Sequence, residues 1–174
     1  PYEFSLAGEK VELTPASFHA EDVDTIVYLP RQKFIMAVDT ITPGEAPFMN
    51  FGATSDVGAY MTFFETILKY EFDHILSGHV SALGTREDVI AARDYAQDVW
   101  QTAGAGMATF LDRFNATLAA FEYKNANLAY RTTIETVRRE CANAVIDRWS
   151  DKLSVVDVWA DSHCETVILY NIMH

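Results

Sequence analysis

Three side chains that can bind a metal ion lie beside short strand-like runs: His19, Asp39 and His79. Asp39 directly follows one apolar run, 34–38, His79 ends a second, 72–78, and His19 stands shortly before a third. A polar group beside a short apolar strand lies where a buried sheet meets the site-bearing edge of an α/β fold. Imidazole and carboxylate are ligands that zinc, iron and manganese accept. The pattern predicts an α/β sheet with candidate metal ligands along its edge.

The first forty residues have the alternation and β-branched content that predict strands. Residues 11–13 alternate apolar and polar side chains, and residues 26–27 lie in a β-branched run. The segment 29–33 predicts the turn between two strands. Pro43 and Pro47 bracket a loop, because proline interrupts or ends a helix.

A helix and a short strand are predicted next. Apolar side chains recur at three- and four-residue spacing from Ser55, the expected N-cap, to about Tyr70. The short run 74–76 then predicts a strand, which gives the strand–helix–strand order of α/β layers. Thr85, with Asp88 three residues later, predicts the start of another helix.

The character of the sequence changes after Trp100. Residues 105–123 and 130–149 lack strand alternation and have helical spacing. Ser162 predicts a capping box that opens a short helix over 166–173. The last third of the chain is therefore expected to be helical.

The composition is that of a globular, acidic protein. Apolar residues make up 49% of 174, which is enough for one core. The formal net charge of −12 argues against a nucleic-acid partner, whose phosphates are bound by Lys and Arg. No apolar run approaches the roughly 20 residues that span a bilayer. We therefore expect a soluble protein with no membrane partner, and leave its compartment, cytoplasmic or periplasmic, open.

The two cysteines, Cys141 and Cys164, are too few for a disulfide framework, and no Cys-x-x-Cys pair exists for a structural zinc site. Free cysteine behaves as a small apolar residue in protein cores. Each is expected to be a buried thiol.

Four segments of the first hundred residues are informative because of the order in which they follow one another. Residues 6–13, before His19, look like the hairpin that leads to a metal histidine in a known family, and residues 27–39 look like its strand pair that ends in an aspartate. Residues 43–48 read Pro-Gly-Glu-Ala-Pro-Phe, and residues 77–89 begin with Ser-Gly-His. In this order they resemble the later half of the metallo-β-lactamase superfamily, whose members are metal-dependent hydrolases with an αββα fold. The Pro-Gly-x-x-Pro-Phe loop is similar to that of one large subgroup.

The resemblance implies an α/β architecture in two parts. Residues 1–103 would form the C-terminal half of a metallo-β-lactamase-like αββα sandwich, and residues 104–174 a helical extension packed on it. The extension is similar to the tail of the same subgroup, with a Trp-x-x-x-Leu stretch at 149–153 and His-Cys at 163–164.

The resemblance also implies the metal ligands. His19 would be the third histidine on one ion, Asp39 the bridging and catalytic carboxylate, and His79 a ligand of the second ion. Two zinc ions are expected in the complete protein, with iron or manganese as alternatives. Without the family context, a lone histidine after a strand is more often a hydrogen-bonded core or loop residue.

Three further residues have open or structural interpretations. Asp24 lies five residues after His19, whereas the subgroup usually has an acidic residue four positions on. His74 is expected to be structural. His163 either faces the active-site cleft or has a helix-capping or packing role.

One family motif is missing from this sequence. The first metal motif, His-x-His-x-Asp-His, does not occur, and the chain begins with Pro1. We expect the chain to be the C-terminal part of a longer polypeptide, with a true half-length homologue as the alternative.

The resemblance implies a function for the parent protein. A metal-activated hydroxide would attack an ester, lactone, lactam or similar bond of a small-molecule substrate. The isolated chain is expected to bind metal weakly and to be inactive, with the missing N-terminal half or a second copy as its partner. The rival hypothesis is a non-catalytic interaction or dimerisation module with vestigial ligands.

Overall fold

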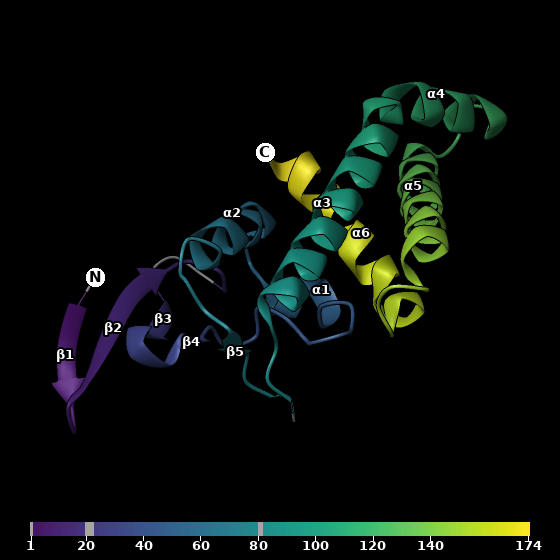
Figure 1. The fold of residues 1–174 in the computed structure, drawn as a ribbon. Coiled ribbons are helices and arrows are strands. Elements are labelled where there is room, and N and C mark those ends of the chain that lie inside the picture. Colours follow the sequence, from purple (N-terminus) through teal and green to yellow (C-terminus); the bar gives the residue numbers. More distant parts are fainter. Residues whose placement is uncertain (1, 20–22, 80–81) are drawn as a thin grey trace.

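A single five-stranded sheet lies at the N-terminal side of the computed structural model, which describes residues 2–19, 23–79 and 82–174 (Figure 1). The strands follow one another across the sheet in chain order. Their bounds are β1 (Tyr2–Leu6), β2 (Glu9–Ala16), β3 (Asp24–Leu29), β4 (Phe34–Met36) and β5 (His74–Leu76). The predicted hairpin is therefore present as β1 and β2, and the predicted turn is a 3₁₀ helix, η1 (Pro30–Gln32).

Strand direction brings three strand ends to one edge of the sheet. β2 is antiparallel to β3, and β3 is antiparallel to β4, so β2 and β4 run in the same direction. β5 is parallel to β4. Because β2, β4 and β5 share a direction, their carboxyl ends meet at one edge, and the segments that follow them begin there.

The two faces of the sheet differ in burial. Ile26, Ile35 and Ile75 are fully buried on one face, where they join the core beneath the helices. The register places another apolar row on the opposite face, since Tyr2 lies opposite Leu13, Leu13 opposite Val27, Val27 opposite Met36, and Met36 opposite Leu76. In Figure 1 the helices gather on one side of the sheet. This second apolar row, with Phe4 and Leu6, is named the open face below.

The helices follow the sheet in the chain. They are α1 (Met49–Ala53), α2 (Val57–Ile67), α3 (Arg86–Ala108), α4 (Phe110–Ala120), α5 (Ala126–Trp149) and α6 (Val156–Met173). α3 leads away from the sheet, α4 crosses its far end and α5 returns, so these three helices form an arm (Figure 1). α6 contacts α3, α5 and α1, and one hydrophobic core runs from the sheet into the arm. Within the described residues, no helix is both long and apolar enough to cross a bilayer.

The start of α3 agrees with the sequence prediction. Thr85 accepts a hydrogen bond from the amide of Asp88, and the Asp88 carboxylate accepts one from the amide of Thr85. This capping box satisfies amide groups that have no partner inside the helix. α3 then runs without interruption past residue 103, so the boundary expected between the two parts of the chain falls inside this helix.

Two helix starts were predicted wrongly. α2 is capped by Asp56, which accepts from the amide of Ala59, whereas Ser55 donates its hydroxyl to the carbonyl of His19. The predicted capping box at Ser162 lies inside α6, which begins at Val156. Apolar packing of the earlier turns against α3 and α5 extends this helix beyond its local capping signal.

The prediction of two free thiols was also wrong. Cys141 in α5 and Cys164 in α6 form a disulfide with Cα atoms 6.0 Å apart, although both residues are buried as expected. The packing of α5 against α6 brings these cysteines together, and their separation of 23 residues in the sequence gave no sign of it.

Candidate metal centre

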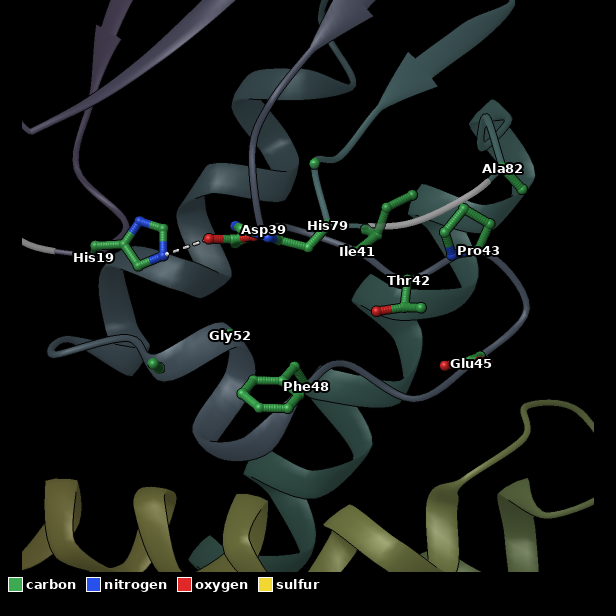
Figure 2. A pocket seen from close by; sticks show the side chains of 12 residues that line it. His19, Asp39, Ile41, Thr42, Pro43, Glu45, Phe48, Gly52, His79 and Ala82 are labelled. Carbon is green, nitrogen blue, oxygen red and sulfur yellow. Dashed lines mark ion pairs between the residues drawn. The ribbon is translucent and has the colours of Figure 1, made fainter.

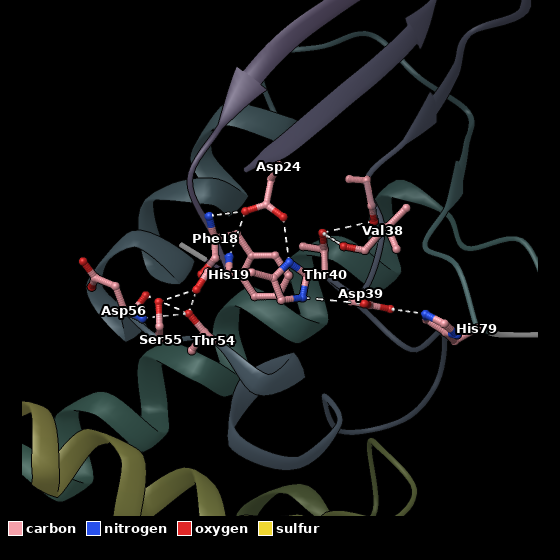
Figure 3. A network of polar contacts seen from close by, with 11 residues as sticks. Phe18, His19, Asp24, Val38, Asp39, Thr40, Thr54, Ser55, Asp56 and His79 are labelled. Atoms are coloured by element: carbon pink, nitrogen blue, oxygen red, sulfur yellow. Dashed lines mark hydrogen bonds and ion pairs between the residues drawn. The ribbon is translucent and has the colours of Figure 1, made fainter. Parts of the chain in front are cut away.

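The three predicted ligands meet at the shared edge of the sheet. His19 follows β2, Asp39 follows β4 and His79 follows β5, which are the three strands that run in the same direction. His19 Nε2 lies 3.6 Å from Asp39 Oδ2, and His79 Nε2 lies 3.4 Å from Asp39 Oδ1 (Figures 2 and 3). The two imidazoles therefore approach different oxygens of one carboxylate.

Asp24 fixes the orientation of His19. Its Oδ1 accepts a hydrogen bond of 2.6 Å from His19 Nδ1, and its Oδ2 accepts from the amides of Phe18 and His19 (Figure 3). Burial opposes ionisation of Asp24, but the hydrogen bonds from the His19 ring and the two amides outweigh it and lower the pKa of this carboxyl. With its proton on Nδ1, His19 presents the lone pair of Nε2 to Asp39, as a metal-binding histidine does. Asp24 therefore contacts the His19 ring across a spacing of five residues.

Left-handed backbone shapes the loops that carry Asp39 and His79. Asp39 has φ of 62° and His79 has φ of 47°. Between the loops, a methyl group at Gly78 would come within 2.8 Å of Val38 Cγ1, so only glycine permits this approach. Non-glycine residues in this conformation store strain, which proteins tend to retain at functional sites.

A left-handed turn, which makes up most of the element labelled α1, lies under the site. Its residues are Asn50, Phe51, Gly52 and Ala53, with φ between 53° and 72°. This conformation costs an L-residue about 1–2 kcal/mol, so other contacts must hold the turn. Gly52 lies so near the site that a methyl group there would be 2.5 Å from the carbonyl oxygen of Asp39.

A cavity of about 720 Å³ opens beside the three candidate ligands (Figure 2). Its walls carry the apolar Ile41, Pro43 and Phe48 beside the polar Thr42 and Glu45, with His19, Asp39 and His79 at one end. A cavity of this size with a few convergent polar groups is typical of small-molecule sites.

The donor set and its spacing fit divalent metal ions. A tetrahedral zinc ion holds nitrogen and oxygen ligands near 2.1 Å, which places two ligands about 3.4 Å apart. The separations of 3.4 and 3.6 Å match this value and exceed an ordinary hydrogen bond. The pairs His19–Asp39 and Asp39–His79 could each contribute two ligands to one ion.

Each pair alone is short of a complete coordination set. Across residues 2–19, 23–79 and 82–174, no group of three or more His, Cys, Asp or Glu side chains is arranged to hold a metal ion. A catalytic zinc ion is usually held by three protein ligands. His79 is also 81% exposed, so little in these residues fixes its ring.

The other histidines lie away from this site. His74 is exposed at the start of β5. His163 is fully buried in α6, which supports the packing role rather than direct exposure to the cleft. The sequence did not single out Gly52 or Phe48 as site residues. Gly52 lies against Asp39 and Phe48 lines the cavity only because distant parts of the chain fold together.

No protein-family model and no curated protein matches the chain. A solved metallo-beta-lactamase family protein from Thermus thermophilus is similar over 99% of this chain and 46% of its own, at 13% identity and a TM-score of 0.51. A metallo-beta-lactamase from Pontibacter korlensis matches 53% of this chain and 44% of its own, at 20% identity and a TM-score of 0.46. The sec-alkylsulfatase Pisa1 from Pseudomonas sp. matches 97% of this chain and 25% of its own, at 14% identity and a TM-score of 0.49.

These likenesses concern the fold. The chain has a metallo-β-lactamase-type α/β fold with C-terminal helices, which confirms the predicted fold class. The matching region covers less than half of each of these solved structures.

Proposed function

We propose that the chain forms part of a metal-dependent hydrolase, in which Asp39 is shared by two divalent ions. His19 would complete the ligand pair of one ion and His79 that of the other. The observation that carries this proposal is the approach of the two Nε2 atoms to opposite oxygens of Asp39, at 3.6 and 3.4 Å, beside a cavity. Zinc suits this set of imidazole and carboxylate ligands best, with iron and manganese as alternatives.

The residues of the chain have distinct tasks in this proposal. Bound ions would lower the pKa of a water molecule and polarise a carbonyl or phosphoryl oxygen of the substrate. Asp24 holds the His19 ring with Nε2 free, which keeps this ligand ready for an ion. The apolar side chains of Ile41, Pro43 and Phe48 in the cavity wall would accommodate the apolar part of a small ester, lactone, lactam or related substrate.

The same proposal predicts that the chain needs a partner for activity. Two ligands per ion give weak metal binding, because part of the binding energy is then used to bring the missing ligands into place. The open face of the sheet supports a partner, since Tyr2 and Leu6 are 65% and 67% exposed in an apolar row. Such a patch favours a protein contact. The other portion of the fold is the favoured occupant, because this chain matches only 46% of the similar Thermus thermophilus structure.

A second candidate function is a non-catalytic interaction or dimerisation module. The observation that favours it is the same open face, which a second copy of the chain could cover. The two functions differ in the metal site, since a module has no need of Asp39.

Zinc titration of the chain tests the metal site. We expect weak binding by the wild type, loss of binding in Asp39→Asn, and no change in Asp112→Asn, a carboxylate exposed on the arm. Equal zinc affinity in wild type and Asp39→Asn would contradict the ligand assignment. Two tightly held ions per chain would contradict the need for further ligands.

Hydrolysis is tested on a longer polypeptide. Reading the coding sequence upstream of Pro1 for an in-frame His-x-His-x-Asp-His motif identifies the protein to assay. We expect Asp39→Ala to abolish its turnover of ester, lactone and lactam substrates. Unchanged turnover would remove Asp39 from the mechanism and favour the interaction module.

A further inference from the structure

Three polar side chains of α6 contact Phe48 and Asn50, at the start of the left-handed turn. Ser162 Oγ accepts a hydrogen bond from the amide of Asn50 at 3.3 Å, and Thr166 Oγ1 donates to Asn50 Oδ1 at 3.3 Å. Between them, His163 Nε2 lies 3.1 Å from the carbonyl oxygen of Phe48. More than a hundred residues separate the two segments in the sequence, yet these contacts bind one to the other.

The hydrogen-bond partners of His163 define which ring nitrogen carries the proton. The Phe48 carbonyl can only accept, so Nε2 carries the proton and donates it. Nδ1 of the neutral ring then accepts from the hydroxyl of Tyr95, at 2.8 Å. The ring also stacks on Phe51 of the left-handed turn, with centroids 4.3 Å apart. Both ring nitrogens and one ring face are thus occupied, and His163 has a single orientation.

On its other side, the turn and the residues that follow it contact the backbone of two candidate ligands. Gly52 packs against the Asp39 carbonyl with no room for a methyl group. Thr54 donates its hydroxyl to the carbonyl of Phe18 at 2.5 Å, and the amide of Ser55 donates to the carbonyl of His19 at 3.1 Å (Figure 3). The turn therefore lies between α6 and the segments that carry His19 and Asp39.

We propose that His163 is a positioning residue of the metal centre, which holds the left-handed turn in place so that the turn sets the backbone of His19 and Asp39. This inference rests on the proposed metal site, but the positioning itself exists without metal. It also assigns α6 a role in the site, although none of its residues lines the cavity among the described residues.

Three variants of the full chain test the proposal. His163→Leu removes both hydrogen bonds, and His163→Gln retains an amide N–H that can reach the Phe48 carbonyl. Tyr95→Phe removes only the hydroxyl that donates to His163 Nδ1, and it keeps the aromatic ring, so it is the variant least able to prevent folding. Val137→Ala is the matched control, because Val137 is buried in the arm against Gly106.

Two readouts separate positioning from general destabilisation. The first is the NMR signal of the His19 Nδ1 proton in the metal-free chain, which reports the hydrogen bond to Asp24. The second is the zinc dissociation constant from a titration. In His163→Leu we expect the His19 Nδ1 proton signal to disappear, because the proton exchanges with water. We also expect the zinc dissociation constant to rise about tenfold, which is the lower end of the loss seen when residues that support metal ligands are replaced. Tyr95→Phe should have a smaller effect in the same direction, and His163→Gln should recover most of the loss.

The outcomes distinguish this inference from the proposed function. If Val137→Ala, at equal loss of stability, changes the His19 signal as much as His163→Leu does, the positioning role is overturned. An unchanged His19 signal in both His163→Leu and Tyr95→Phe also overturns it, whatever the zinc affinity. If wild type binds no zinc but the His19 signal depends on His163, the metal site fails and the positioning stands.

Discussion

Replacement of Gly52 by alanine tests whether the left-handed turn and Asp39 are in contact. A methyl group at Gly52 meets the Asp39 carbonyl oxygen at 2.5 Å and Phe18 Cζ at 2.9 Å, and the residue has φ of +72°. Two costs therefore add. The left-handed backbone costs an L-residue about 1–2 kcal/mol, and overpacking of a filled region costs about 1–3 kcal/mol. We expect Gly52→Ala to lower the free energy of unfolding by roughly 2–5 kcal/mol.

Two other glycines separate these costs. Gly44 has φ of +74° and nothing within 4 Å of an added methyl group, so Gly44→Ala measures the backbone cost alone, about 1–2 kcal/mol. Gly104 lies in α3 with no neighbour within 4 Å of an added methyl group, so Gly104→Ala should stabilise the chain by about 0.5–1 kcal/mol.

Urea unfolding of the three variants gives the stabilities, and zinc titration shows whether the site moves. We expect Gly52→Ala alone to weaken zinc binding, because its methyl group displaces the Asp39 backbone. Equal losses of stability in Gly52→Ala and Gly44→Ala would refute the contact, since the added packing cost would then be absent.

Three further predictions concern the surroundings of the site. Asp24→Asn should weaken zinc binding by about tenfold to a hundredfold in a titration, because His19 loses the carboxylate that fixes its ring; an unchanged affinity would exclude that role. Burial lowers the pKa of His163 to about 4, so below pH about 6.5 the unfolded chain binds a proton that the folded chain does not. The free energy of unfolding should therefore fall by up to about 3 kcal/mol between pH 6.5 and 4, and the fall should shrink in His163→Gln; an equal slope in both proteins would contradict this assignment. Replacing Cys141 and Cys164 by alanine opens a loop of 23 residues and should cost about 3 kcal/mol in urea unfolding; an unchanged midpoint would show that the disulfide does not stabilise the chain.

Local patterns predicted the elements that depend on nearby residues. The strands β2, β3 and β5 and the capping box of α3 each arise from alternation, β-branched residues or a side chain that satisfies an adjacent amide. The convergence of His19, Asp39 and His79 followed from the order of the family segments, and the common direction of three strands is its physical basis.

The features that the sequence did not predict depend on distant contacts. The left-handed turn contains two residues, Phe51 and Ala53, that disfavour its conformation, and partners more than a hundred residues away stabilise it. The disulfide requires α5 and α6 to pack side by side, which no spacing of two cysteines reveals. Only the assembled core brings these segments together.

Anomalous diffraction at the zinc edge, from crystals of the chain grown with zinc, locates each metal ion relative to Asp39. We expect one peak between His19 Nε2 and Asp39 Oδ2, and a second between His79 Nε2 and Asp39 Oδ1. Zinc bound only at other places, with Asp39 free of metal, would contradict the proposed metal centre.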